Sequence, residues 1–115
     1  MSAARRSEAA VIGDLLAAAE DAAELARRGR TAFDDDVLLR RAGEAIAGQI
    51  TEAAGKLSED LKASVPDVPW EDIIGMRIVL HHRYHAIDRD TLWAVIEVDI
   101  PALAAALKPF ADGDG

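Results

Sequence analysis

The chain has 115 residues, the length of one ordinary domain, and 50% of them are hydrophobic, enough for a buried core. Its formal net charge of −8 argues against a passive binder of long nucleic acids, since such proteins are usually basic. It has no cysteine, which excludes disulfides and thiolate metal sites. No stretch approaches the roughly 20 apolar residues of a membrane span, and no signal peptide is evident. We therefore expect a soluble, cytoplasmic protein without membrane contact.

The apolar residues are small. Aromatic residues make up only 4% of the chain, and much of the hydrophobic share is alanine. Alanine favours helices but buries little area per residue. A thin alanine-rich core is marginal alone, so we expect some apolar surface to be buried against a second copy of the chain.

The N-terminal half predicts two helices. The first extends from about Ser7, a suitable N-cap, to Arg28, and Gly29 is a plausible stop. Residues 31–36 are predicted to form a turn, whose aspartates suit the start of the next helix. The second helix extends from about residue 35 to residue 64 on apolar spacings of three and four. Three glycines interrupt it, where they weaken the helix or mark a close helix approach: Gly43, Gly48 and Gly55.

The C-terminal half predicts two or three more helices. Pro69 is well placed at the start of a helix that is apolar on most sides. Asp88 is predicted to cap a further helix, from about residue 89 to residue 108, which Pro101 should kink or split. The expected fold is an all-α antiparallel bundle of four to five helices. It forms a single domain over residues 1–110, followed by a disordered tail over residues 111–115.

A basic, histidine-rich segment follows the apolar part of the third helix. Between residues 77 and 89, three arginines (Arg77, Arg83 and Arg89) stand against one acid (Asp88), a local charge of +2. All three histidines of the chain lie there as well. A basic island on an acidic body can recruit a phosphate group locally without binding long duplexes.

This segment resembles a known motif. Arg77, His82 and Tyr84 follow the pattern of arginine, four residues, histidine, one residue and tyrosine. The Pro69-Trp70 pair, residues 75–77 (Gly-Met-Arg) and a later proline, Pro101, match the surrounding pattern. With this context the chain resembles HepT-like proteins, a branch of the HEPN superfamily of small all-helical ribonucleases. The resemblance spans about residues 14–109.

The resemblance implies a function. HepT-like proteins are toxins that cleave RNA without a metal, act as homodimers and are encoded beside a small nucleotidyltransferase antitoxin. In the family the antitoxin adds adenylyl groups to the motif tyrosine, here Tyr84. The resemblance thus predicts a HEPN-like homodimer without a cofactor. Its predicted activity is that of an endoribonuclease, which cleaves an RNA such as tRNA or mRNA and leaves 2′,3′-cyclic phosphate ends.

The chemistry of these residues is consistent with that activity. An imidazole such as that of His82 can remove the proton of the RNA 2′-OH or protonate the leaving 5′ oxygen. A guanidinium such as that of Arg77 can stabilise the negative charge of the transition state. Tyr84 can bond a phosphate oxygen or position the imidazole. The flanking side chains are predicted secondary contacts to RNA: His81, Arg83 and His85.

Helical geometry adds a constraint. A step of five residues on a continuous helix rotates by about 140°, so Arg77 and His82 would not share a face. Arg77 and Tyr84, seven residues apart, would lie nearly in line. Either the helix distorts between the motif residues, or the site is completed across a two-fold axis, which would make dimerisation part of the mechanism.

Other interpretations of the segment remain open. Arg77 could be a structural residue that pairs with an acid, and His82 a structural histidine. His81 and His85 have the spacing of a helical zinc site, but no acid stands at a motif spacing, so we expect no metal. Ile78 departs from the family, which usually carries a polar residue there. This favours an alternative function: a catalytically weak dimer that binds nucleotide or a nucleotidyltransferase. A third candidate is a purely structural helical dimer.

Overall fold

The computed structural model describes the backbone of residues 2–81 and 88–111, and the side chains of residues 8–76 and 88–111. Within these ranges every regular element is a helix, which confirms the predicted all-α class. The elements are α1 (Ser2–Arg27), α2 (Gly29–Asp35), α3 (Val37–Gly55), α4 (Glu59–Ser64), α5 (Trp70–His81), α6 (Arg89–Ala94), the π-helix η2 (Val95–Asp99) and α7 (Ile100–Ala111).

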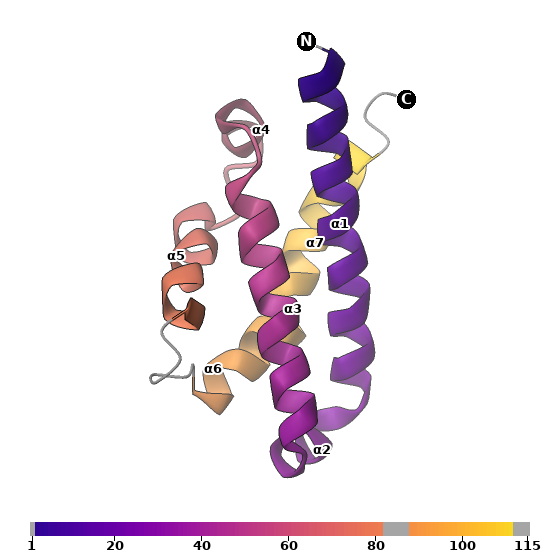
Figure 1. Ribbon diagram of the computed structural model, residues 1–115, viewed down its shortest axis with the longest axis vertical. Coiled ribbons are helices and arrows are strands. Elements are labelled where there is room, and N and C mark those ends of the chain that lie inside the picture. Colours follow the sequence, from indigo (N-terminus) through magenta and orange to yellow (C-terminus); the bar gives the residue numbers. More distant parts are fainter. Residues whose placement is uncertain (1, 82–87, 112–115) are drawn as a thin grey trace.

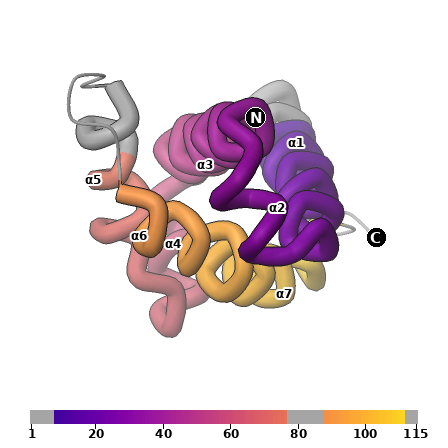
Figure 2. The backbone as a smooth tube through the Cα atoms, turned by 90° about the horizontal axis from the view of Figure 1, so that it is seen from below, coloured from indigo at the N-terminus to yellow at the C-terminus, as the bar shows by residue number. Residues whose placement is uncertain are grey.

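The helices form two layers. The long helices α1 and α3 are antiparallel neighbours, and the short α2 makes the corner between them (Figure 1). Helix α7 packs against α1 and α5 packs against α3, so the C-terminal half covers one side of the α1–α3 pair (Figure 2). The start of α1 and the end of α7 lie at the same end of the bundle, far from the α2 corner (Figure 1).

The core lies between these layers. Apolar side chains of α1 and of the C-terminal helices face it, and its largest fully buried side chains come from both layers: Phe33, Ile12, Leu15, Leu92, Ile96, Ile100 and Leu107. Both tryptophans contribute to it, since Trp93 is buried and Trp70 packs against the core cluster. Thr51 is buried as well, and its hydroxyl donates to the carbonyl of Gly48 (3.1 Å).

The prediction for the first helix is wrong at its start and correct at its end. Helix α1 begins at Ser2, so Ser7 lies inside the helix and the predicted cap at Ser7 is wrong. Gly29 has a φ of +88°, in the left-handed region where glycine has no steric penalty, so the predicted stop is confirmed.

The predicted turn over residues 31–36 is helical instead. Residues Gly29–Asp35 form α2, whose Phe33 is buried in the core. Burial of this ring and an ion pair at helical spacing, Arg30 Nε to Asp34 Oδ1 at 2.9 Å, stabilise the short helix. The true boundary is Asp36, whose carboxylate accepts from the N–H of Leu38 (2.9 Å) and caps α3.

The predicted long second helix is divided. Helix α3 ends at Gly55, and α4 begins at Glu59 after the cap residue Ser58. A contact from α1 stabilises the break: the carboxylate of Glu8 accepts from the N–H (2.7 Å) and the Oγ (3.0 Å) of Ser58. Leu57 and Leu61 remain buried, so the apolar spacing continues across the break while the helix does not.

The last predicted helix is interrupted just before Pro101, where a π-helix separates α6 from α7. The N–H of Ile100 donates to the carbonyl of Val95, five residues back, and residues Val95–Asp99 are π-helical. Pro101 has no N–H, and its ring would clash with the carbonyl four residues earlier in a regular α-helix. The wider turn immediately before Pro101 accommodates it, and α7 extends to Ala111, the first residue of the predicted tail. The remainder of that tail lies outside the described residues.

Gly43 marks the close helix approach that the sequence suggested. A Cβ there would lie 2.7 Å from Cδ1 of Ile96, which is fully buried, whereas nothing lies within 4 Å of a Cβ at Gly48. We expect Gly48→Ala to raise the free energy of unfolding by about 0.5–1 kcal/mol, because alanine favours helix. Gly43→Ala should lower it by about 1 kcal/mol, because overpacking outweighs that gain. Urea unfolding of both variants measures the difference; equal gains would show that the contact with Ile96 relaxes freely.

Candidate active site

The predicted motif begins on α5 and continues past its end. The backbone of Arg77 lies on α5, and His81 is the last residue of that helix. The side chains of these two residues lie outside the described part of the structure, as do residues 82–87 entirely. His82, Arg83, Tyr84 and His85 are among them. The structure therefore describes the elements on either side of the predicted site.

Helix α5 is anchored at its start. The indole Nε1 of Trp70 donates to the carbonyls of Lys62 (3.1 Å) and Val65 (3.0 Å), which ties the first residue of α5 to the end of α4. Ile73 is buried one turn later, and Met76 packs against the core from a partly buried position. The helix that carries Arg77 therefore has a fixed base against α3 and α4.

The predicted cap at Asp88 is confirmed. Its Oδ1 accepts from the N–H groups of Asp90 (2.9 Å) and Thr91 (3.2 Å), and its Oδ2 accepts from the hydroxyl of Thr91 (2.6 Å). The hydroxyl of Thr91, followed by its backbone N–H, lowers the pKa of the Asp88 carboxyl from its ordinary value of 3.8. The cap residue of α6, four positions after Tyr84, is thus held in a fixed position.

This cap predicts a pH dependence of stability. Because the pKa of Asp88 is lower in the folded state, its contribution is present above pH 3.8 and is lost as the pH falls through the lowered value. Asparagine can accept the same bonds without titrating. We therefore expect the difference in Tm between the wild type and Asp88→Asn to shrink or reverse on acidification. Thermal unfolding across this range tests it, and a difference that does not change with pH would contradict it.

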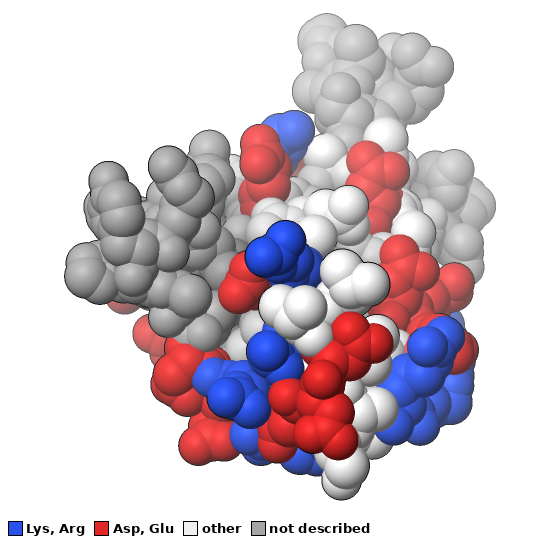
Figure 3. Space-filling model, turned by 60° about the horizontal axis from the view of Figure 1, so that its bottom comes forward, with Lys and Arg blue, Asp and Glu red and all other residues white. Residues whose placement is uncertain are grey.

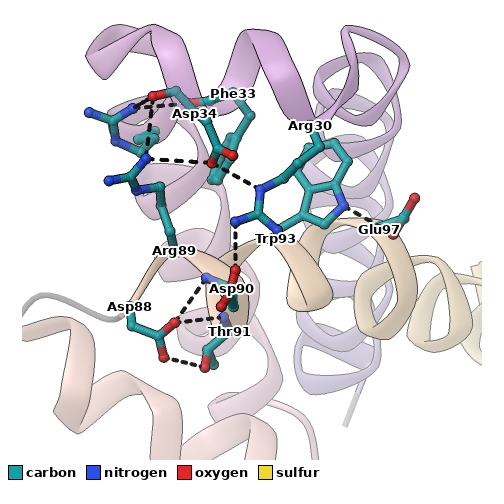
Figure 4. A network of polar contacts seen from close by, with 10 residues as sticks. Arg30, Phe33, Asp34, Asp88, Arg89, Asp90, Thr91, Trp93 and Glu97 are labelled. Atoms are coloured by element: carbon teal, nitrogen blue, oxygen red, sulfur yellow. Dashed lines mark hydrogen bonds and ion pairs between the residues drawn. The ribbon is translucent and has the colours of Figure 1, made fainter.

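A polar network joins α2 to the start of α6 (Figure 4). The guanidinium of Arg30 lies between two carboxylates, Asp34 on its own helix (2.9 Å) and Asp90 on α6 (2.6 Å). Hydrogen bonds to these two carboxylates raise the pKa of Arg30 above its already high ordinary value. From α6, Nη1 of Arg89 lies 3.7 Å from Oδ1 of Asp34. Arg40 donates to the backbone carbonyls of Phe33 and Asp34 and holds the end of α2.

An aromatic pair lies behind this network. The rings of Phe33 and Trp93 pack with their centroids 5.1 Å apart and their planes tilted by 50°. Nε1 of Trp93 donates to the carboxylate of Glu97 (3.0 Å), so the one polar atom of the indole is satisfied. The network and the aromatic pair together hold α6 against α2 (Figure 4).

These links were not predicted from the sequence. Arg30 lies between the end predicted for the first helix and the turn predicted over residues 31–36, which includes Asp34. The spacing of four residues between them was the available signal, since it suits a helical ion pair. The pairing of Arg30 with Asp90 joins residues 60 positions apart, and no local pattern reveals such a contact.

Two grooves in the described surface do not suit a phosphate. A groove of about 620 Å³ between α1 and α3 is lined by three acids, Asp14, Asp21 and Glu52, and one base, Lys56. A second groove, of about 810 Å³ between α4 and α5, is also lined by three acids and one base: Glu59, Glu71, Asp72 and Lys62. Both would repel an anionic substrate.

The end of the molecule near the α2 corner differs. Basic side chains lie there directly beside acidic ones (Figure 3). The ion pairs from α2 to α6 belong to this end, and Arg89 extends the predicted basic segment into it with a side chain that is 53% exposed. Positive and negative side chains are thus mixed at this end, whereas acids outnumber bases in the two grooves.

Two further findings concern the described residues alone. Among them, no group of three or more histidine, aspartate or glutamate side chains is arranged to hold a metal ion. No helix in residues 2–81 or 88–111 combines the length and the apolar character needed to cross a membrane.

The known proteins that are similar to this chain share a description as ribonucleases. Residues 15–110 match the family model described as "Ribonuclease HepT-like". A relative named "Putative RNase MJ1380", from Methanocaldococcus jannaschii, is 29% identical over 100 residues, which cover 86% of this chain and 92% of the relative. No solved structure matches the chain.

Two further relatives share shorter segments. "Putative RNase TTE0752", from Caldanaerobacter subterraneus subsp. tengcongensis, is 33% identical over 76 residues, or 66% of this chain and 68% of the relative. "Probable ribonuclease HepT", from Thermococcus cleftensis, is 37% identical over 54 residues, or 47% of this chain and 49% of the relative.

Proposed function

This chain belongs to the ribonuclease HepT-like family, and on that premise we propose that it is a metal-independent endoribonuclease that acts in the cytoplasm as the toxin of a toxin–antitoxin system. The observation that carries the proposal is the family match over residues 15–110, which includes Arg77, His82 and Tyr84 at the motif spacing. Two features support placing the active site at these motif residues. The two grooves described above are acidic, and the helices on both sides of the motif, α5 and α6, are anchored to the rest of the fold.

The proposed reaction uses the nucleophile that RNA carries. The imidazole of His82 accepts the proton of the 2′-OH as that oxygen attacks the adjacent phosphorus. The new bond from the 2′ oxygen to phosphorus closes a 2′,3′-cyclic phosphate, and the bond from phosphorus to the 5′ oxygen breaks. The proton held by the imidazolium of His82 then passes to the leaving 5′ oxygen, directly or through a water molecule, so that this oxygen departs as a hydroxyl and the imidazole is restored. Neither a metal nor a redox partner is needed.

The other motif residues act on the phosphate. Arg77 donates charge-assisted hydrogen bonds to the oxygens that gain negative charge in the transition state. Tyr84 bonds a phosphate oxygen or orients the imidazole. His81, Arg83 and His85 are proposed to bind the RNA backbone beside the cleaved bond.

Dimerisation and regulation complete the proposal. On a continuous helix Arg77 and His82 would lie about 140° apart, and a second copy related by a two-fold axis offers a way to combine the two groups in one site. We further propose a cognate nucleotidyltransferase antitoxin that transfers an adenylyl group to the hydroxyl of Tyr84. That modification would fill the site and block the motif.

A second function deserves a test because of Ile78. Where the family usually carries a polar side chain, isoleucine offers no hydrogen bond to a phosphate or to the histidine. The alternative is a catalytically weak dimer that binds nucleotide or a nucleotidyltransferase at the same place.

The deciding experiment is an RNA cleavage assay in EDTA with purified protein whose Tyr84 is verified as unmodified by mass spectrometry. The substrates include tRNA and mRNA. We expect cleavage that leaves 2′,3′-cyclic phosphate ends, which would make Ile78 a tolerated change. Without cleavage of any of these RNAs, the enzymatic proposal fails for them. Binding of ATP or of the nucleotidyltransferase by the same preparation would then establish the alternative.

A further inference from the structure

The outer side of the last helix carries little charge. Helix α7 lies at the outside of the bundle with α1 on its inner side (Figure 2). Of its 12 residues only Lys108 is charged. The exposed side of α7 continues back through η2 to the end of α6, and Val98 on this side is 57% exposed. Its apolar members are mostly small and are all exposed: Ala94, Val98, Pro101, Ala102, Ala105 and Pro109.

The core does not account for this apolar side. A surface helix normally carries polar residues on the face that points away from the core, and a helix that is apolar all round is normally covered on every side. The core takes up the opposite side of α7, through the buried residues Ile100, Leu103 and Leu107. The exposed side therefore has the composition of a contact surface that a single chain leaves uncovered.

Length and charge argue against a membrane or a nucleic acid as the partner. The 12 residues of α7 fall short of the roughly 20 that a membrane span requires. Helices that lie on anionic membranes, and surfaces that bind nucleic acids, carry many basic residues, whereas this helix has one and the whole chain has a net charge of −8. A protein surface of low charge is the better partner. Two acidic copies of one chain repel each other least where each carries little charge.

Two charges beside this face are spaced to suit a second copy. Glu97 and Lys108 are 11 positions apart, about three helical turns, so they lie on nearly the same side of the helix. About 16 Å of helix separates them, too far for an ion pair within one chain. If two such helices pack antiparallel about a two-fold axis near Ala102, Lys108 of each copy meets Glu97 of the partner subunit. The small side chains of Ala102 and Ala105 let the two helices approach closely at that axis.

We propose that two copies of this chain associate through the outer sides of η2 and α7, which pack antiparallel about a two-fold axis near Ala102. The association would cover the apolar face and extend a core that one alanine-rich chain makes only thin. The proposed function calls for a second copy without assigning a face to it, and to that extent the inference rests on the proposed function. Its evidence lies in residues 94–109, outside the predicted motif.

The first test is sedimentation equilibrium of the full chain over a wide range of concentrations, with folding checked by circular dichroism. We expect a monomer–dimer equilibrium for the wild type. Ala102→Glu should raise the Kd of the dimer by at least about 100-fold, because the axis brings the two new carboxylates together. The matched control is Ala45→Glu, the same change at an exposed alanine of α3 in the other layer, which should leave the Kd unchanged. A wild type that stays monomeric, or a dimer that Ala102→Glu leaves intact, would overturn the proposal.

The second test exchanges the paired charges. Lys108→Glu and Glu97→Lys should each raise the Kd by about 10-fold, and the double variant should return it to within about threefold of the wild type. Glu97 also accepts from Nε1 of Trp93 (3.0 Å). That bond is lost in Glu97→Lys and in the double variant alike, so it does not affect the comparison between them. A double variant that associates no better than Glu97→Lys would overturn the antiparallel arrangement.

RNA cleavage by the same preparations separates this inference from the proposed function. A dimer that dissociates on Ala102→Glu, in a protein that cleaves no RNA, would support the interface and count against the enzyme. A protein that cleaves RNA and whose dimer survives Ala102→Glu would refute this interface alone.

Discussion

Replacement of His82 by alanine is expected to lower the rate constant of RNA cleavage by about 10²–10⁴-fold, the usual contribution of a general acid–base group. The proposed reaction needs a proton acceptor for the 2′-OH, and an imidazole has a pKa near neutrality. The measurement is single-turnover cleavage of a labelled RNA in EDTA, with the Tm of each variant recorded. We expect the Tm to change little, because His82 follows the end of α5 and this helix is held in the core near its start, where Ile73 is buried.

The other histidines provide the comparison. His85→Ala should weaken RNA binding and so raise KM, with a smaller effect on kcat than His82→Ala. Glu20→Gln, an exposed change on α1, controls for the preparation of variants. Full activity of His82→Ala with the normal product ends would remove His82 from the mechanism.

Replacement of Phe33 by alanine is expected to lower the free energy of unfolding by about 3–5 kcal/mol, the usual cost of truncating a buried aromatic residue. Phe33 is fully buried and packs against Trp93 with the ring centroids 5.1 Å apart. Its loss leaves a cavity where α2 meets α6. For a domain stabilised by about 5–15 kcal/mol this is a large fraction. Urea unfolding followed by Trp fluorescence measures it.

The chain offers a matched control in its only other phenylalanine. Phe110 lies near the end of α7 and is only partly buried, so Phe110→Ala should cost less than Phe33→Ala. Phe33→Leu fills part of the cavity and should recover part of the loss. Equal effects at the two phenylalanines would show that burial at the α2 corner does not dominate stability.

Features that depend on a single residue could be predicted from the sequence. Gly29 ends the first helix because only a residue free to adopt a positive φ fits there, and Asp88 caps α6 because its carboxylate reaches the next N–H groups. The all-α class followed from apolar spacings, which are strong over long segments.

Features that depend on distant partners could not be predicted. The break after Gly55 is held by the contact from Glu8 to Ser58, 50 residues apart, while the apolar stripe continues through Leu57 as if the helix were unbroken. Most of α2 was predicted as a turn because its aspartates suit the start of the next helix, whereas burial of Phe33 holds this segment in a helix. Tertiary packing overrode local preference in both cases.

The candidate site shows the same division. Arg77, His82 and Tyr84 were identified by their spacing in a family context, which requires no geometry. The pairing of Arg30 with Asp90, which ties α2 to the helix after the motif, joins residues 60 positions apart, and sequence spacing does not encode it. The predicted placement of the motif side chains lies outside the described residues and stays a prediction.

The packing of α7 along α1 determines when such an enzyme could become active. During synthesis the motif segment leaves the ribosome before α7, yet the core on α1 is completed by Leu103 and Leu107 of α7. Domains fold as units, so a growing chain that lacks α7 carries the motif without the scaffold that holds it. On the proposed function, a nascent chain would therefore not become a competent nuclease until α7 has been completed and packed against α1.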